Sequence, residues 1–421
     1  MRLVALALVV PCLAGCSGIF QRVRPEVPAS YAVLTDASSG LSVGSAERDV
    51  TPEVGGYMAG FDPARTSTSV ARPLKVRALV LETGSRRIAI VGVDNLGLMR
   101  EDVDWIKRGL AGFANGDVFV CSSHTHAGPD MIGLWGFYFM SSGRDRDYLV
   151  RLREATATAV AEARANAAPA RLLRGQAMLP PSGLVKNANR RFVFDRRVTV
   201  LHAQALDDGR PLGSLLHLAC HPEVQPRRNT AISADFVGAL CDEWRARGHG
   251  QAVFANGALG AMVSPDVHPR DETGVAAFGK GACDLCEKAL HEAEPLVVDE
   301  IEVRRADVYL PMISAGFRVG RLTTVLEREL FDGAARSTVG FLRLGSFEAV
   351  AVPGEMEPVL AARLRAQLRR PDLVVLGLCD DEVGYLLRDK DARDPEFAYE
   401  RSMSPCLSAG ELVSTAIAGR P

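Results

Sequence analysis

The stretch Val118-Phe119-Val120-Cys121-Ser122-Ser123-His124-Thr125-His126-Ala127-Gly128-Pro129 is the part of the chain on which the fold prediction rests. Its apolar start is short enough for a buried strand, and Gly-Pro ends the run. If the strand continues through the two histidines, its period of two turns both imidazoles to the same face. Neutral histidine is the commonest metal ligand, although a His-x-His pair also arises by chance near strand ends.

The composition is that of a globular protein and excludes some classes of function. The chain has 421 residues, of which 47% are hydrophobic and 24% charged, and its formal net charge is -2. Because there is no basic excess to release counterions from phosphates, we expect no nucleic-acid partner. The length allows one large domain or two smaller ones.

The N-terminal segment predicts export and a lipid anchor. Arg2 precedes an apolar run over residues 3–13 that is too short to span a bilayer. The following Leu-Ala-Gly-Cys resembles a bacterial lipobox, so we expect a signal peptide over 1–15 and lipidation of Cys16; a plain secretory signal is the alternative. Ser17 favours sorting to an outer membrane, if the cell has one. Residues 16–40 carry Pro25 and Pro28 and are predicted to form a tether, followed by one catalytic domain over 41–421.

The remaining cysteines are predicted to pack in the core. Without Cys12 and Cys16 seven remain, an odd number, and most lie within apolar runs, where free cysteine behaves as a small hydrophobe. Cys283 and Cys286 have the spacing of a redox motif but lie in a helical pattern without a second Cys-x-x-Cys, so core packing is favoured for them too.

From about Leu41 onward the hydrophobic pattern predicts an α/β fold with mixed sheets flanked by helices. The predicted strands are 76–82, 87–93, 118–122, 198–206, 214–220, 252–255, 341–344, 349–352 and 373–378. The predicted helices are 100–115, 147–167, 234–247, 275–293 and 357–369.

Several of these strands end in residues that can take part in chemistry. The residues are His124, His221, Asn256, Glu355 and the pair Asp380 and Asp381. In open α/β sheets ligands bind outside the carboxyl ends of the strands, so we expect these ends to converge on one pocket.

Three of the converging side chains suit a catalytic zinc ion. His124, His221 and Glu355 would supply three ligands and leave one position open. A dication there would lower the pKa of bound water from about 15.7 towards 7, which gives a nucleophile for amide hydrolysis. His126, held nearby by its spacing, would hydrogen-bond the oxyanion or shuttle a proton. Glu355 has an alternative role as the N-cap of the next helix.

The other histidines have structural interpretations. His202 and His217 lie inside strand patterns and are predicted to be hydrogen-bonded in the core. His249 and His291 end helical patterns and are expected to be solvated, while the pattern around His268 indicates only a loop.

Five motifs in sequence resemble those of the neutral, non-lysosomal ceramidases. The zinc-binding segments of that family resemble Ser-His-Thr-His-Ala-Gly-Pro at 123–129, Ala-Cys-His-Pro at 219–222 and Val-Pro-Gly-Glu-Met at 352–356. Met-Val-Ser-Pro-Asp at 262–266 is similar to the serine segment of the active site, and Gly-Leu-Cys-Asp-Asp-Glu-Val-Gly-Tyr at 377–385 to the segment with a tyrosine ligand. The resemblance runs from about Val43 to Ser404.

The resemblance implies a set of site residues. The zinc ligands would be His124, His221, Glu355 and Tyr385. Ionising a phenol of pKa about 10 at pH 7 costs about 4 kcal/mol, which contact with a dication can supply. Residues that orient the substrate or stabilise the tetrahedral intermediate would be His126, Arg190, Ser264 and Tyr399. Ser264 has no Gly-x-Ser-x-Gly elbow, which favours hydrogen bonding over a nucleophilic role.

The sequence also departs from the family pattern. Met262 stands where many relatives carry an acid, and full-length ceramidases have a further C-terminal domain, whereas this chain stops at Pro421. The resulting prediction is a zinc-dependent hydrolase of the ceramidase type, anchored to the cell envelope through Cys16 and cleaving the amide of ceramide or a related N-acyl lipid. The alternatives are hydrolysis of an ester or other small polar substrate, and a surface lipoprotein that binds a ligand without turnover. No oligomeric state is predicted.

Overall fold

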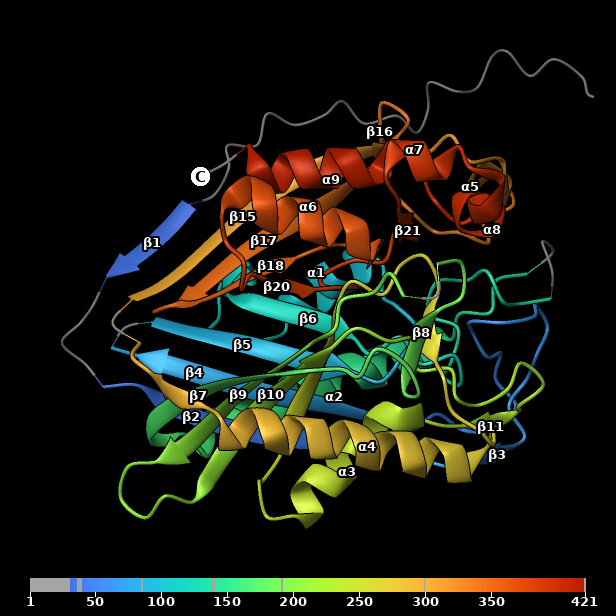
Figure 1. The fold of residues 1–421 in the computed structure, drawn as a ribbon. Coiled ribbons are helices and arrows are strands. Elements are labelled where there is room, and N and C mark those ends of the chain that lie inside the picture. Colours follow the sequence, from blue (N-terminus) through green and yellow to red (C-terminus); the bar gives the residue numbers. More distant parts are fainter. Residues whose placement is uncertain are drawn as a thin grey trace, which may run out of the picture.

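The computed structural model describes residues 31–35, 40–84, 86–137, 141–190, 192–298 and 300–419. Two β-sheets face one another, and helices cover the outer face of each (Figure 1). The larger sheet has the strand order β12-β10-β9-β7-β2-β4-β5-β6, with β14 paired to β7. The smaller sheet has the order β1-β15-β17-β18-β20, with β16 paired to β17.

The strands of both sheets are bounded as follows. The larger sheet contains β2 (Ser42–Asp49), β4 (Lys75–Thr83), β5 (Arg86–Val93), β6 (Val118–Ser122), β7 (Ala168–Met178), β9 (Arg197–Ala205), β10 (Pro211–Leu218), β12 (Ala252–Asn256) and β14 (Glu294–Leu296). The smaller sheet contains β1 (Tyr31–Thr35), β15 (Glu300–Pro311), β16 (Leu330–Phe331), β17 (Ala334–Leu344), β18 (Phe347–Ala351) and β20 (Val374–Leu376). Short paired strands are β3 (Ser69–Val70) with β11 (Ala231–Ile232), β8 (Val185–Asn187) with β13 (Val263–Pro265), and β19 (Glu355–Met356) with β21 (Tyr385–Leu386).

The helices bury their apolar faces against the two sheets. Residues of α2, α3 and α4 pack on the larger sheet and those of α6 and α9 on the smaller one, as Figure 1 shows. The helices are α1 (Arg100–Lys107), α2 (Arg146–Ala165), α3 (Asp235–Ala246), α4 (Glu272–His291), α5 (Ala315–Leu322), α6 (Pro358–Leu368), α7 (Asp389–Ala392), α8 (Ala398–Ser402) and α9 (Ala409–Ala418). In this described part of the chain no helix has the length and apolar character to cross a bilayer.

Curvature of the larger sheet brings its two edges together. Strand β12 packs against β5 and β6, although these strands lie at the opposite end of the strand order. The approach is close, because a Cβ atom at Gly92 of β5 would lie 3.0 Å from the carbonyl oxygen of Phe254 in β12. The carboxyl ends of β6, β10 and β12 therefore lie near one another.

The predicted fold class is confirmed, and most predicted elements are present to within a few residues. All seven cysteines of the described segments are free and buried, as the sequence predicted. The predicted histidine bonds within the core are also present, from His202 to the Ser214 hydroxyl at 2.8 Å and from His217 to the Val375 carbonyl at 2.9 Å.

Several predictions need correction. The helix predicted over 100–115 ends at Lys107, because the glycines at 109 and 112 follow and Gly112 has a φ of +80°. Part of the predicted tether is strand β1, which pairs with β15. His249 is not simply solvated, because it bonds Glu287 at 2.8 Å and stacks on Trp244. The signal peptide and the lipidation of Cys16 lie outside the described residues.

Candidate metal centre

Strand β6 delivers the two histidines of the His-x-His motif to a buried position. The strand ends at Ser122, so the pair follows it rather than continuing its alternation. His124 has a φ of +74°, a conformation that residues other than glycine seldom adopt and that often marks a functional site. The ring centroids of His124 and His126 are nevertheless only 5.0 Å apart. The loop conformation, not the strand period, thus brings the two rings together.

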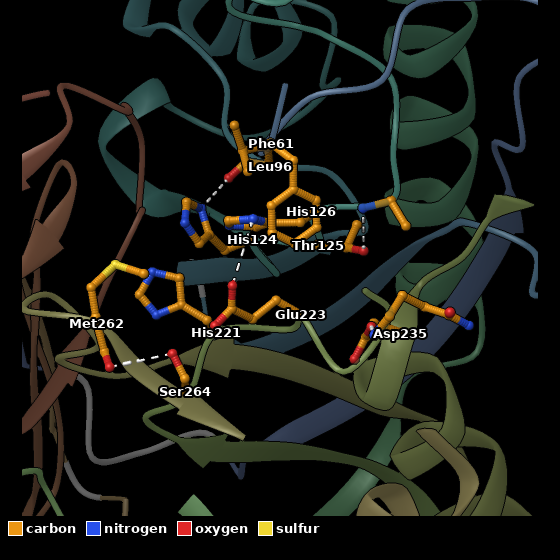
Figure 2. Close-up of polar contacts among 12 residues, drawn as sticks. Phe61, Leu96, His124, Thr125, His126, His221, Glu223, Asp235, Met262 and Ser264 are labelled. Atoms are coloured by element: carbon orange, nitrogen blue, oxygen red, sulfur yellow. Dashed lines mark hydrogen bonds and ion pairs between the residues drawn. The ribbon is translucent and has the colours of Figure 1, made fainter. Parts of the chain in front are cut away.

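A third histidine joins them from the other edge of the larger sheet. His221 follows β10, and its ring centroid lies 5.0 Å from that of His124 and 5.7 Å from that of His126. Each ring offers a nitrogen within 4.8 Å of the others, and all three residues are buried. Figure 2 shows the rings turned toward a common centre.

A carboxylate and a phenol complete the cluster. Glu355 and Tyr385 are direct partners in the parallel pairing of β19 with β21. The Glu355 carboxylate lies 3.0 Å from Nε2 of His221 and 3.6 Å from Nε2 of His124. The Tyr385 hydroxyl donates to the Met262 sulfur at 3.1 Å. Met262, which departs from the family pattern, thus contacts the phenol directly.

The second nitrogen of two rings is fixed by a main-chain carbonyl. Nδ1 of His124 lies 2.7 Å from the Leu96 oxygen (Figure 2), and Nδ1 of His221 lies 2.8 Å from the Val263 oxygen. Such a bond holds the proton on Nδ1 and leaves the Nε2 lone pair for a metal ion. Both Nε2 atoms point to the Glu355 carboxylate, so the tautomers and the donor set fit a metal site.

The pKa shifts of the two ligand rings have opposite directions. Burial lowers the pKa of His124 to about 4. Burial is the largest single influence on His221 and acts to lower its pKa, but the hydrogen bond to Glu355 and the charges of Glu355 and Glu223 together raise the pKa above the ordinary value. Burial alone would raise the pKa of Glu355; His124 and His221 reverse this and hold it below its usual range. In the absence of a cation the two rings therefore stabilise the ionised carboxylate.

His126 differs from the other two rings. Neither of its ring nitrogens has a hydrogen-bond partner among the described residues. The Glu223 carboxylate lies 4.0 Å from Nδ1, and the edge of Phe61 packs on the ring. Burial and the neighbouring rings lower its pKa well below the ordinary value. A neutral ring with two unused nitrogens is available to bind or accept a proton from a ligand.

Asn256 ties together the two strand ends that carry the histidines. Its side-chain amide donates to the oxygens of Ser123 and Cys220 at 3.0 and 2.8 Å. Its oxygen accepts from the Cys220 N–H at 3.1 Å, and the residue is fully buried. Asn256 was predicted as a polar strand end, and the structure places it as a brace between β6 and β10.

The remaining predicted residues lie at different distances from the cluster. Tyr399 lines the adjacent cavity, and its ring centroid is 6.2 Å from that of Tyr385. Ser264 is in β13 and donates to the Met262 oxygen at 3.3 Å. Arg190 instead bonds Asp391 at 2.8 Å and lies over the Phe397 ring. The structure thus groups the four predicted ligands and His126, but turns Arg190 toward α7.

A cavity opens beside the cluster. Its polar lining includes His124, His126, Glu355 and Tyr385. Its apolar lining residues are Leu96, Ile132, Leu134, Trp135, Met312 and Phe317, among others. A mostly apolar lining with a few polar groups is usual for small-ligand sites and suits a molecule with an apolar chain.

The sequence did not reveal every polar residue of this region. Glu223 follows the motif histidine at 221 by two residues, and Glu382 follows the acidic pair at 380 and 381. Both are buried, at 7% and 9% exposure. Their closeness to motif residues was the available signal, since an acid on the core side of a strand end is rarely without a function or a partner.

The fold and the site define an α/β sandwich with a histidine and carboxylate cluster at the strand ends. Neutral ceramidase from Pseudomonas aeruginosa has this fold: the TM-score is 0.73, with 15% sequence identity over 91% of this chain and 74% of that chain. A structure described as ceramidase complexed with C2 gives the same TM-score and identity and is covered over 75% of its length. The sequence matches no protein-family model and no curated protein.

Proposed function

We propose that the chain is a zinc-dependent hydrolase of the neutral ceramidase family that cleaves the amide bond of an N-acyl substrate, ceramide or a related lipid. The observation that carries the proposal is the meeting of His124, His221, Glu355 and Tyr385 beside a largely apolar cavity. The resemblance of five motifs and the shared fold support it.

The ligand side chains would hold the ion with little rearrangement. His124 and His221 would bind through Nε2, because their Nδ1 atoms are held by carbonyl groups. Glu355 would add a carboxylate oxygen and Tyr385 its phenol oxygen, two side chains fixed side by side by strand pairing. When bound, a zinc ion supplies Lewis acidity and lowers the pKa of a bound water towards 7.

Other residues would position the substrate and move protons. Apolar lining residues such as Trp135 and Phe317 would bind the acyl or base chain and exclude water from the polar side chains of the site. His126 would hydrogen-bond the carbonyl oxygen or accept the proton of the attacking water, since both of its nitrogens are unused. Tyr399 would contact the substrate at the cavity. A contribution from Arg190 would require it to leave Asp391.

We also propose that the protein is an exported lipoprotein, held on the cell envelope through Cys16. The lipobox-like Leu-Ala-Gly-Cys supports this location, which suits an enzyme with a lipid substrate. Expression of the full chain and of a Cys16→Ser variant in a bacterial host, followed by membrane fractionation, tests the anchor. The wild-type chain should sediment with membranes, and recovery of both chains in the soluble fraction would contradict the proposal.

The enzymatic proposal is tested by metal analysis of the purified protein followed by hydrolysis assays. Ceramide, simple N-acyl amides and matched esters should be compared, and the amides should be cleaved by the zinc-loaded protein. His291→Ala is a suitable control, because His291 is exposed at the end of α4. Absence of amide cleavage with a full complement of zinc would reject the proposal.

A further inference from the structure

Three consecutive acids follow β20, and all three are buried, although their side chains have different partners. Asp380 is neutralised twice, by Nζ of Lys107 at 2.7 Å and by the Arg305 guanidinium at 2.5 Å. It also accepts from the N–H of Val120, which ties the acidic run to β6. Burial of this charge is thus balanced by two cations, as buried carboxylates usually require.

The second acid is satisfied as well. Asp381 forms an ion pair with Arg328 and accepts from the Ser337 hydroxyl at 2.6 Å. It also accepts from the main-chain N–H groups of Arg100 and Glu382. The Arg328 guanidinium is therefore paired with Asp381, and its hydrogen bond to the third acid goes to the main chain, to the Glu382 oxygen at 3.2 Å.

The third acid, Glu382, keeps one oxygen without a partner. Its Oε1 accepts from the Gly384 N–H at 2.7 Å, whereas Oε2 is buried and has no hydrogen bond among the described residues. The residue is 9% exposed and lines the same cavity as His124 and Glu355. Buried polar atoms without a partner are rare in folded proteins, so each one needs an explanation.

The position of the Glu382 side chain is fixed by close packing. A Cβ atom at residue 97 would lie 2.6 Å from both Cβ and Cγ of Glu382, so the main chain of Gly97 packs directly on the stem. The same cavity is lined by apolar residues such as Ile132, Leu134 and Leu326 and by the charged Arg328. The carboxyl group is therefore one of a few fixed polar points in a largely apolar lining, which is the usual form of a specificity contact.

We propose that Glu382 determines the specificity of the site by hydrogen-bonding a hydroxyl group of the substrate through its free oxygen. This rests on the proposed amide hydrolysis and assigns the residue that would recognise a substrate hydroxyl close to the scissile amide. A hydroxyl both donates and accepts, so it pairs with the carboxyl group in either protonation state. An unsubstituted alkyl chain at the same place would leave the carboxyl unpaired.

The test uses two ligands that differ only at the hydroxyl. N-Hydroxyethyl dodecanamide and N-propyl dodecanamide are matched in size, with the hydroxyl replaced by a methyl group. The zinc-loaded full chain should cleave the hydroxylated amide with a kcat/KM about tenfold higher, the scale of one hydrogen bond and the desolvation of its partner. Equal kcat/KM values for the two amides would overturn the proposal.

Variants separate the contact from a general effect on the site. Glu382→Met keeps an unbranched stem that fits beside Gly97 and should reduce the preference to about twofold or less, because the acceptor is lost. Glu382→Gln keeps an oxygen and should retain most of the preference. Glu411→Met, at a partly exposed acid of α9 that pairs with Arg363, should retain all of it. A tenfold preference that persists in Glu382→Met would overturn the proposal.

A binding measurement distinguishes failure of this contact from failure of the enzymatic proposal. The corresponding pair of dodecanesulfonamides has no carbonyl to attack, so calorimetric titration measures recognition without turnover. Tighter binding of the hydroxylated sulfonamide in wild type, but not in Glu382→Met, supports the contact even if no amide is cleaved. Amide cleavage with equal binding of both sulfonamides rejects the contact and leaves the hydrolase in place.

Discussion

The buried histidines of this chain fall into two regions with different roles. His202 and His217 lie within β9 and β10 and each bonds one neighbour, a hydroxyl and a carbonyl respectively. His124 and His221 also have one nitrogen bonded to a carbonyl, but their other nitrogens converge on Glu355. Burial and one hydrogen bond are common to both pairs. Convergence of the second nitrogen on another ligand is what separates a candidate metal site from a core contact.

The largest effect is expected from removing a ligand of the cluster. His124→Ala or His221→Ala should lower zinc content to background and reduce amide turnover by about 10³-fold or more, because the open metal position is lost. His217→Ala, which removes a histidine from β10, the strand that precedes His221, should keep stoichiometric zinc. Metal analysis and steady-state kinetics on the three variants measure the difference. Full activity in His124→Ala would contradict the distinction between metal-binding and structural histidines.

A substitution that displaces only His126 should have the next largest effect. Gly60 has a φ of +99°, and a Cβ atom there would lie 2.5 Å from Cγ of His126. Gly60→Ala should reduce turnover by about 10²-fold, the cost of a misplacement near 1 Å, without loss of zinc. Gly55→Ala is the matched control, since Gly55 has a φ of +104° with no atom near the added Cβ. Equal losses in both variants would assign the effect to backbone strain.

Replacing Asn256, which hydrogen-bonds the ends of β6 and β10, should have a smaller effect. Asn256→Ala leaves buried groups of Ser123 and Cys220 without partners and should reduce the free energy of unfolding by about 1–3 kcal/mol. Zinc affinity should fall about 10–100-fold, as for other residues that orient ligands. Asn229→Ala, whose side chain bonds only the main chain of Ala231 among the described residues, should leave zinc affinity unchanged. Chemical denaturation and competition with a chelator give both quantities.

The smallest effect is the pH dependence of stability that we expect from His202, one of the two histidines with a structural role. Burial, followed by the nearby His249, lowers the pKa of His202 to about 4 in the folded protein. Below pH 6.5 the unfolded chain binds the proton and the folded chain does not, so stability falls as the pH drops from about 6.5 to 4. The loss attributable to His202 should be about 1–3 kcal/mol and should be absent in His202→Gln. Denaturation of wild type and of His202→Gln at a series of pH values measures this loss. If the free energy of unfolding changed equally with pH in both proteins, the assignment to His202 would be contradicted.

Part of this site was predictable from sequence because its ligands directly follow apolar runs. The pattern is an apolar run followed within a few residues by a polar residue, which can be recognised in the sequence alone. It applies to His124, His221, Glu355 and Asn256. Tyr385 was found only through the family resemblance, since a tyrosine in a short strand usually packs. The pairing of β19 with β21 places it beside Glu355, and this contact joins residues thirty positions apart.

Other features depend on contacts that a single sequence does not encode locally. The curvature that brings β12 onto β5 and β6 involves strands more than a hundred residues apart. The long strands β7 and β15 were not predicted, because their alternation is interrupted by charged residues such as Arg171 and Arg305, which the structure pairs with Gln204 and Asp380. The bond from Arg190 to Asp391 likewise depends on the docking of α7.

The central claim is that four side chains far apart in the sequence bind one cation. A crystal structure of the zinc-loaded protein with anomalous data at the zinc edge tests this directly. We predict a single strong peak within bonding distance of Nε2 of His124 and His221, a Glu355 carboxylate oxygen and the Tyr385 hydroxyl. A peak elsewhere, or none at this cluster in crystals with bound zinc, would contradict the account.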